Sequence, residues 1–427
     1  MTTARDEARP RPYPEQADDA QLEGDLPYVP GSARAALAYR DFRLIWGGAF
    51  ASNVGTWMQN VALGVFAFQL AHSAGYVSLL GFAQLGPLLA LAMVGGALAD
   101  VVDRKVLLII CQLEQMVMSA VLAWVAASGH PSKVLVFVVV VLVGIGNAIN
   151  APTFSSVLPT LVGRRDLPGA VSLQSVQMNV ARVIGPAVGG LLIPVVGVGG
   201  IFALNAVTYV FAIGPLLVVP LPRVAAAANS GLQRIAQGIR IARQDDLIRQ
   251  CLTIIATLSF FCLPFIGLMP VLAARNLGID PESSLYGGLY ALFGLGAAAG
   301  AVSVGTVFVS QPRRRLVRVG LGAFALSLLA FALVRSAEAA YPVALIVGFT
   351  YFVTVTSLST ALQEHIADEV RGRVTALWIM GFGGTIPLGL LAAGAVASAS
   401  NITVVLLIGA AVAALLAART RLSLRAS

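Results

Sequence analysis

Residues 96–105 read Gly-Ala-Leu-Ala-Asp-Val-Val-Asp-Arg-Lys and lie between two long apolar runs. This short charged segment predicts a turn between two helices that cross a membrane and leave it on the same face. Helices joined in this way are antiparallel. Arg104 and Lys105 indicate that the turn lies on the cytoplasmic face, where basic residues are in excess.

The composition of the whole chain agrees with a membrane protein. Of its 427 residues, 58% are hydrophobic and 11% are charged, and the mean hydropathy is +0.85. A soluble domain of this size carries more charge. The net charge of +8 comes mostly from short loops between apolar runs, so it indicates orientation in a lipid bilayer and not binding to nucleic acid.

Twelve apolar runs are long enough to cross a hydrocarbon core about 30 Å thick as helices, so we predict an all-α integral membrane protein with two six-helix halves. The predicted spans are 42–70, 77–99, 106–127, 134–161, 168–195 and 199–219, then 248–275, 285–309, 316–334, 341–363, 374–397 and 402–418. The corresponding domains are a disordered cytoplasmic tail at 1–40, an N-terminal half at 41–221, a cytoplasmic linker at 222–247, a C-terminal half at 248–419 and a tail at 420–427. The first tail is a solvated segment or, alternatively, a partner-binding one.

Basic residues alternate between the two sides of these twelve spans. The predicted outer loops carry only Lys133, Arg275 and Arg335, whereas every predicted inner loop and both tails carry at least two basic residues. This asymmetry places both termini in the cytoplasm. We therefore expect a multi-pass protein of the inner (plasma) membrane.

The two halves resemble each other in sequence. Placing Gly96 over Gly305 aligns Arg104 with Arg313 without a gap, although Val309 takes the place of Asp100. Internal repeats of this kind are common in transporters with a central site between their halves. Between the halves, residues 230–246 predict an amphipathic helix at the inner membrane surface.

The hairpin at 96–105 resembles the signature that the major facilitator superfamily carries between its second and third spans, with Asp103 as a variant typical of its drug and siderophore exporters. Residues 185–190, Gly-Pro-Ala-Val-Gly-Gly, resemble the antiporter motif of the same superfamily. With residues 39–46, 268–273 and 371–374, the chain looks like the branch of enterobactin-type siderophore exporters and macrolide efflux proteins.

This resemblance implies a secondary active transporter that exports a small siderophore-like or drug-like molecule by alternating access, with proton-coupled antiport. It also implies that Asp100 and Arg104 belong to a cytoplasmic gate, in which Asp100 meets the start of span eleven. Alternatively, the charges of the hairpin only fix topology, which suits Lys105 better than Asp100. Gly185, Pro186 and Gly189 allow close packing and a bend, so we expect a pivot there.

Two stripes of polar and aromatic side chains are candidates for the substrate cavity. Asn53, Trp57 and Asn60 share one face of the first span. A similar stripe in the fourth span consists of Asn147, Asn150 and Phe154. Further candidates are Phe260 and Phe261 in the seventh span and Tyr351 and Thr354 in the tenth. A cavity of this kind suits a large, neutral or weakly charged molecule. The alternative is that the amides bond across helices and the aromatic rings pack between them.

Two charged residues lie deepest within the predicted spans. Glu114 is the best candidate for a carboxylate that couples proton movement to transport, but the favoured alternative is that it pairs with a base or reaches the inner surface. We expect Arg182 either to bind an anionic group or to hold Glu114 in place as its structural partner. Span four lacks the arginine that many proton-coupled members of the superfamily carry before Gly144, which leaves the usual coupling scheme open.

The sequence favours neither an enzyme nor a cofactor-dependent protein. His72, His130 and His365 show no ligand spacing, so no metal site is expected, and no phosphate-binding loop is present. Cys111, Cys251 and Cys262 lie within apolar runs as packing residues. We expect a monomer with no cofactor, and the remaining alternative to export is import of a small metabolite.

Overall fold

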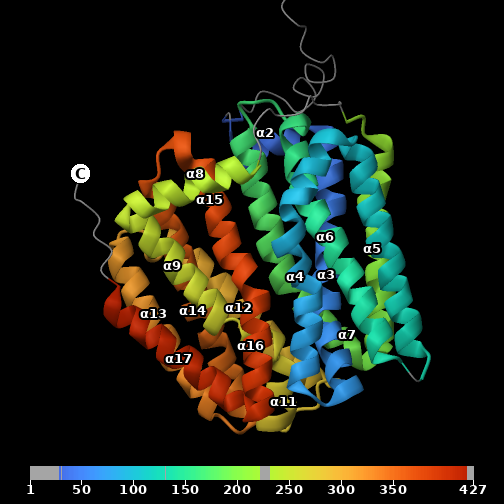
Figure 1. The fold of residues 1–427 in the computed structure, drawn as a ribbon, viewed down its shortest axis with the longest axis vertical. Coiled ribbons are helices and arrows are strands. Elements are labelled where there is room, and N and C mark those ends of the chain that lie inside the picture. The colour runs from blue at the N-terminus through green and yellow to red at the C-terminus, as the bar shows by residue number, and fades with distance from the viewer. Residues whose placement is uncertain (1–27, 30, 130, 222–230, 421–427) are drawn as a thin grey trace, which may run out of the picture.

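The computed structural model describes residues 28–29, 31–129, 131–221 and 231–420, and these form a bundle of long helices without strands (Figure 1). The predicted all-α fold is confirmed. Helix α8 (Gly231–Gln244) lies across one end of the bundle, which we call the linker end. The short helix α11 (Met269–Asn276) lies at the opposite end, which we call the α11 end.

The first group of helices comes from the N-terminal half of the chain. It comprises α3 (Arg40–Ala71), α4 (Ala74–Val101), α5 (Arg104–Ala127), α6 (Lys133–Leu161) and α7 (Leu167–Val218). Helix α7 has 52 residues but breaks at Gly197, where φ is 69°. Because glycine adopts positive φ without steric cost, the chain turns back there. The break falls between the predicted spans 168–195 and 199–219.

The second group comes from the C-terminal half. It comprises α9 (Asp246–Phe261), α10 (Pro264–Gly267), α11, α12 (Ser284–Gly305), α13 (Arg313–Leu333), α14 (Ala337–His365), α15 (Asp368–Ile379), η1 (Met380–Gly384), α16 (Thr385–Ala399) and α17 (Ile402–Arg419). The span predicted at 248–275 is divided into three pieces, because Pro264 and Pro270 each begin a new helix. The span predicted at 374–397 is interrupted by the π-helical turn η1, which contains three glycines.

Within the described residues, ten helices are long and apolar enough to cross a membrane. The predicted count of twelve is therefore not confirmed. One of the ten is α7, which would be roughly 78 Å long if it were straight, whereas the hydrocarbon core is only about 30 Å thick. Helix α3 is not among the ten, and it carries several polar residues, including Asn53, Gln59 and Asn60.

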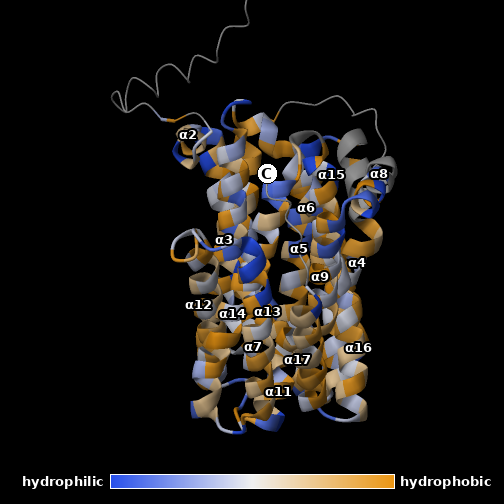
Figure 2. Cartoon of the chain, turned by 90° about the vertical axis from the view of Figure 1, so that its left-hand side faces the viewer, coloured by the Kyte–Doolittle hydropathy of each residue, from blue (hydrophilic) through white to orange (hydrophobic). Residues whose placement is uncertain are grey.

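The surface between the two ends is apolar. Figure 2 shows hydrophobic residues along the middle of the bundle and hydrophilic residues gathered towards its ends. Large side chains such as Val195 and Trp124 are 77% and 68% exposed on this surface. An apolar surface of this extent is typical of contact with lipid.

The predicted disordered tail at 1–40 needs a correction. Residues 1–27 lie outside the described part of the chain, but Ala33–Ala38 form helix α2. Asp166 holds this segment, since its carboxylate accepts hydrogen bonds from the Gly31 N–H and from the Tyr39 hydroxyl, each at 2.9 Å. Ala36 is fully buried, so the last residues of the predicted tail are part of the packed structure.

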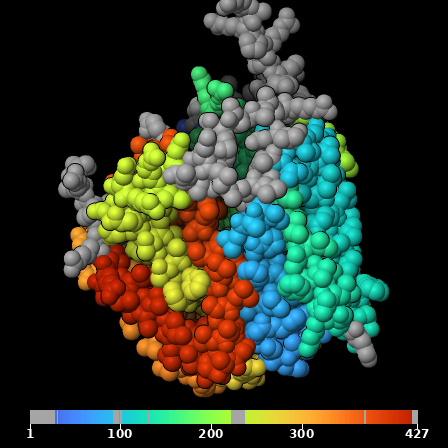
Figure 3. Space-filling model, in the orientation of Figure 1, coloured from blue at the N-terminus to red at the C-terminus, as the bar shows by residue number. Residues whose placement is uncertain are grey.

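The two groups meet along two pairs of helices. Helix α7 packs against α12, and α4 packs against α16, as Figure 3 shows for the second pair. Gly190 and Gly287 bring α7 and α12 into backbone contact, because a Cβ added to Gly190 would lie 2.3 Å from the Gly287 Cα. Small residues at such crossings let helices approach closely within a membrane.

Candidate substrate and coupling site

The two groups of helices bring a cation and two aromatic rings together near the middle of the bundle. The guanidinium carbon of Arg182 lies 5.3 Å from the centroid of the Trp57 ring and 5.6 Å from that of Phe382. Trp57 and Arg182 come from α3 and α7, whereas Phe382 comes from η1 in the other half. Such distances allow cation–π attraction, so Arg182 links the halves electrostatically.

The glycines of the fifth predicted span position Arg182. Gly185 lies against Trp57, because an added Cβ would be 2.4 Å from the Trp57 Cβ, and Gly189 lies similarly against Met58. These contacts hold α7 close to α3. The Nε of Arg182 is buried and has no hydrogen-bond partner in the described part of the chain, so part of the hydrogen-bonding capacity of this side chain is unused there.

Contacts between the halves are concentrated at the α11 end. Arg275 donates a hydrogen bond to the His72 carbonyl oxygen at 2.9 Å, and the Gln69 amide donates one to Glu282. An added Cβ on Gly394 would lie 2.2 Å from the Ser78 Oγ, close to the α11 end of α4 and α16. The α11 end of the boundary between the halves is therefore closed.

Glu114 lies near the middle of α5. Both of its carboxylate oxygens are buried, and neither has a hydrogen-bond partner among the described residues. No described ion pair joins it to Arg182 or to another base. The favoured expectation that Glu114 pairs with a base or reaches the inner surface is therefore wrong for this conformation.

A buried polar network lies beside Glu114 in the first group of helices. Tyr209 donates a hydrogen bond to the Gln115 side chain at 3.1 Å, and Asn205 donates one to Gln59 at 2.9 Å. Asn205 also donates to the Ser119 hydroxyl at 3.3 Å. These residues were not predicted from the sequence, although glutamine, asparagine and tyrosine inside apolar spans are the signal that would have found them.

The predicted amide stripes are only partly available to a ligand. The Asn60 side chain accepts a hydrogen bond from Gln84 at 2.6 Å, and Asn150 accepts one from Gln112 at 3.4 Å, which fits the alternative of bonding across helices. Asn53 and Asn147 are half-buried and make no hydrogen bond within the described part of the chain. These last two amides remain candidates for contact with a ligand.

The aromatic candidates separate into two classes. Tyr351 is 2% exposed, and its hydroxyl has no hydrogen-bond partner among the described residues. Phe154 instead packs against an apolar cluster of the first group, as Trp46 does. This agrees with the alternative that the aromatic rings pack between helices.

Phe260 and Phe261 contact each other edge to face, with centroids 4.8 Å apart, and Phe261 is 41% exposed. Thr354 is fully buried and donates to the Thr350 carbonyl oxygen at 2.8 Å, next to Gly320 of α13. Thr354 therefore packs between helices, and Phe382, which the sequence analysis missed, is the aromatic residue of the second group that contacts Arg182.

The predicted gate residues have distinct surroundings. Arg104 donates to the Ser156 carbonyl oxygen at 3.0 Å. Lys105 donates to the carbonyl oxygens of Leu217 and Val219 at 3.2 and 2.9 Å, where a cation stabilises the end of α7. Asp100 belongs to α4, but its side chain lies outside what the structure describes, so its contact with span eleven stays a prediction.

The described residues contain no group of three or more His, Cys, Asp or Glu side chains placed to hold a metal ion. The three cysteines are buried and free, in agreement with a packing role. The polar groups of the candidate site are a cation between aromatic rings, a buried carboxyl group and amides.

Solved structures of transporters have the same fold. A bacterial homologue of the lysosomal transporter Spinster, in an inward-facing and occupied conformation, gives a TM-score of 0.71 at 15% identity over 89% of this chain and 96% of that one. A mutant of the nucleoside transporter NupG gives 0.70 at 13% identity over 88% and 98%. These similarities show that the chain shares the fold of these proteins.

Residues 31–426 match the major facilitator family described as transmembrane secretion effectors, and the chain belongs to this family. The enterobactin exporter EntS of Escherichia coli O1:K1 is 27% identical over 339 residues, which cover 79% of this chain and 80% of the exporter. The staphyloferrin A transporter of Staphylococcus aureus is 29% identical over 180 residues, which cover 42% of this chain and 45% of that transporter. The chain is therefore a transport protein and not an enzyme.

Proposed function

We propose that this protein is a secondary active transporter of the inner membrane that exports a small, acidic, siderophore-like molecule in exchange for protons. The observation that carries the proposal is the position of Arg182 between Trp57 and Phe382 at the boundary between the halves. A charge inside a membrane bundle is costly and typically serves transport. A substrate bound there contacts both halves, as alternating access requires.

The surroundings of Arg182 favour a substrate with an acidic group and a planar part. The guanidinium offers hydrogen bonds and charge to a carboxylate or another oxyanion, and the rings offer apolar faces. Relatives named as an enterobactin exporter and a staphyloferrin A transporter support a siderophore-like molecule. A neutral drug-like molecule would use the rings and the free amides Asn53 and Asn147 but not the charge.

The direction of transport is inferred from topology. The basic residues predicted to be cytoplasmic include Arg243, Arg249 and Arg313, and the first two lie on or beside the linker helix α8. We therefore assign the linker end and both termini to the cytoplasm. Since the α11 end is closed, we infer that substrate reaches the Arg182 site from the linker end, as the loading of an exporter requires.

Glu114 is the proposed proton carrier. An ionised carboxylate that is buried without a partner carries a large desolvation cost, so the protonated form is favoured in this conformation. A conformation that admits water would favour release of the proton. The Tyr209 and Gln115 network next to Glu114 supplies hydrogen-bonding groups that suit such a change.

The test is transport into inverted membrane vesicles from cells that express the protein, with enterobactin, staphyloferrin A and a macrolide as substrates. The proposal predicts that an acid vesicle interior drives accumulation of a siderophore and that a protonophore abolishes it. If only the macrolide accumulated, the proposed acidic substrate would be wrong and a neutral drug-like substrate would be indicated. Uptake into intact cells, with none into inverted vesicles, would instead establish the alternative of an importer.

A further inference from the structure

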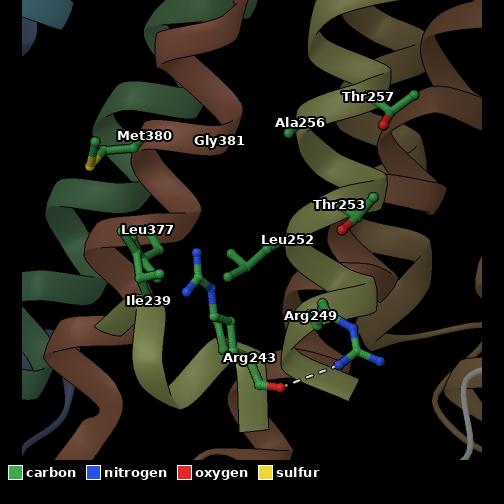
Figure 4. A pocket seen from close by; sticks show the side chains of 11 residues that line it. Ile239, Arg243, Arg249, Leu252, Thr253, Ala256, Thr257, Leu377, Met380 and Gly381 are labelled. Carbon is green, nitrogen blue, oxygen red and sulfur yellow. Dashed lines mark hydrogen bonds between the residues drawn. The ribbon is translucent and has the colours of Figure 1, made fainter. Parts of the chain in front are cut away.

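A cavity lies under the linker helix α8, and the turn η1 that forms part of its wall also carries Phe382 of the Arg182 site. Its volume is about 510 Å³, and α8, α9, α15 and η1 form its walls (Figure 4). The apolar part of the wall includes Ile239, Leu252, Leu377 and Met380. Ile239 and Met380 are 41% and 47% exposed, so the apolar wall opens to the surroundings of the bundle and is not sealed within it.

One cation in this cavity has no partner among the described residues. The Arg243 guanidinium lies between Leu252 and Leu377 in Figure 4, and it makes no hydrogen bond or ion pair within the described residues. Arg249 is different, because it pairs with Asp246 at 2.5 Å and donates to the Arg243 carbonyl oxygen at 3.3 Å. The charge facing the cavity is thus positive, with Arg243 available to an anion.

Cationic, hydroxyl and apolar side chains together line the cavity, and its α9 wall begins at Arg249. Arg249, Thr253 and Thr257 follow one face of α9, so the wall extends roughly 12 Å from the arginine end. Gly238 makes this arrangement possible, since an added Cβ would lie 3.1 Å from the Arg373 carbonyl oxygen of α15. Helix α8 can therefore cover α15 closely while leaving space beside Arg243.

We propose that this cavity binds an anionic phospholipid of the cytoplasmic leaflet, with its phosphate at Arg243 and its acyl chains along Leu252, Leu377 and Met380. Basic pockets at the cytoplasmic ends of membrane helices bind anionic lipid headgroups. A free phosphate would use only the arginine end and would leave the apolar wall uncovered. The bound lipid would hold α8, which joins the two halves, against α9 and α15.

The experiment uses the purified full-length protein in neutral detergent, titrated with dioctanoyl-phosphatidylglycerol or dioctanoyl-phosphatidylcholine, with binding followed by native mass spectrometry. Phosphatidylglycerol is expected to bind more tightly. Arg243→Gln should weaken its binding about tenfold, as expected for loss of a hydrogen bond to a charged group. Arg240→Gln is the matched control, because Arg240 is exposed on the same helix but does not line the cavity.

Leu377→Trp provides a second variant that fills the cavity without changing its charge. It should also reduce binding of phosphatidylglycerol, provided that it elutes as a monodisperse protein like the unmodified chain. Equal binding of phosphatidylcholine, or an equal loss with Arg240→Gln, would overturn the proposal. Glycerol 1-phosphate that competes as well as the lipid would also overturn it, since the site would then recognise phosphate alone.

Discussion

The guanidinium carbon of Arg182 lies 5.3 Å from the centroid of the Trp57 ring. Both residues belong to the first group of helices, and Phe382 of η1 approaches the same cation from the second group. A change in the angle between the halves must therefore alter the surroundings of Arg182. This relationship leads to the first prediction.

Replacing Arg182 with Gln should raise the KM for an acidic siderophore about tenfold, because a hydrogen bond to a charged group is lost. Arg182→Lys should restore part of the affinity, since it keeps the charge but not the planar guanidinium. The measurement is initial uptake into inverted vesicles. Arg318→Gln, a change at an exposed arginine of α13, is the control and should leave the KM unchanged. An unchanged KM in Arg182→Gln would remove this residue from the binding site.

Replacing Glu114 with Gln should uncouple transport from protons, because an amide cannot release a proton. We expect substrate exchange to continue, while accumulation driven by an acid interior falls to the level measured with a protonophore. Glu338→Gln is the matched control, since Glu338 is exposed at the start of α14. Normal gradient-driven accumulation by Glu114→Gln would assign coupling to another group.

Replacing Gly190 with Ala should destabilise the contact between α7 and α12. The added Cβ would lie 2.3 Å from the Gly287 Cα, and this backbone contact can be relieved only by separating the helices. Overpacking of this kind typically costs about 1–3 kcal/mol. Thermal unfolding in detergent measures the effect, with Gly214→Ala as the control because open space surrounds Gly214 in the same helix. Equal melting temperatures for the two variants would contradict the predicted contact.

Asp245 connects the start of α9 to the end of α14. It accepts hydrogen bonds from the Leu247 and Ile248 N–H groups and lies 2.8 Å from the His365 imidazole, with which it forms an ion pair when that ring is protonated. Burial raises the pKa of Asp245, but the hydrogen bonds from Ile248 and His365, together with the charge of His365, lower it more, so the net pKa lies below its ordinary value.

This lowered pKa predicts a pH dependence of stability. The contribution of Asp245 is present above its ordinary pKa of about 3.9 and is lost as the pH falls through the lower value of the folded state. Asp245→Ala should destabilise the protein by about 1 kcal/mol at neutral pH through loss of the cap, and Asp245→Asn by less, because an amide still caps the helix. The measurement is the melting temperature from about pH 5 down to about pH 3. The difference in melting temperature between the unmodified chain and Asp245→Ala should shrink as the pH falls through this range. A difference that grows would contradict the predicted direction of the pH dependence.

The positions of the helices were predictable, because they follow from the local pattern of apolar and polar residues. Apolar length located every long helix within several residues, and helical spacing identified the amphipathic helix α8. Gly-Pro and small residues at 185–190 predicted close packing, which the contacts of Gly185 and Gly189 with α3 show. The breaks at Pro264, Pro270 and η1 were missed, because proline and glycine are common within membrane helices and do not by themselves reveal where a helix divides.

The candidate site was less predictable. Trp57 and Arg182 were selected as polar or aromatic exceptions in apolar spans, but nothing in the sequence placed them together. Phe382 was missed because its approach to Arg182 depends on the π-helical turn and on the way the halves meet. Thr354 and Phe154 have residue types that suit a cavity, yet they pack between helices.

The sequence by itself determined that this protein is a helical membrane transporter, because hydropathy, loop charge and short motifs are local properties of the chain. Only the tertiary structure decided that Arg182 meets rings from both halves, that Glu114 is buried without a partner and that the α11 end is closed. The physical reason is that contacts across helices depend on crossing angles and side-chain packing between residues far apart in the sequence. Spacing along one helix fixes a face but not what that face touches.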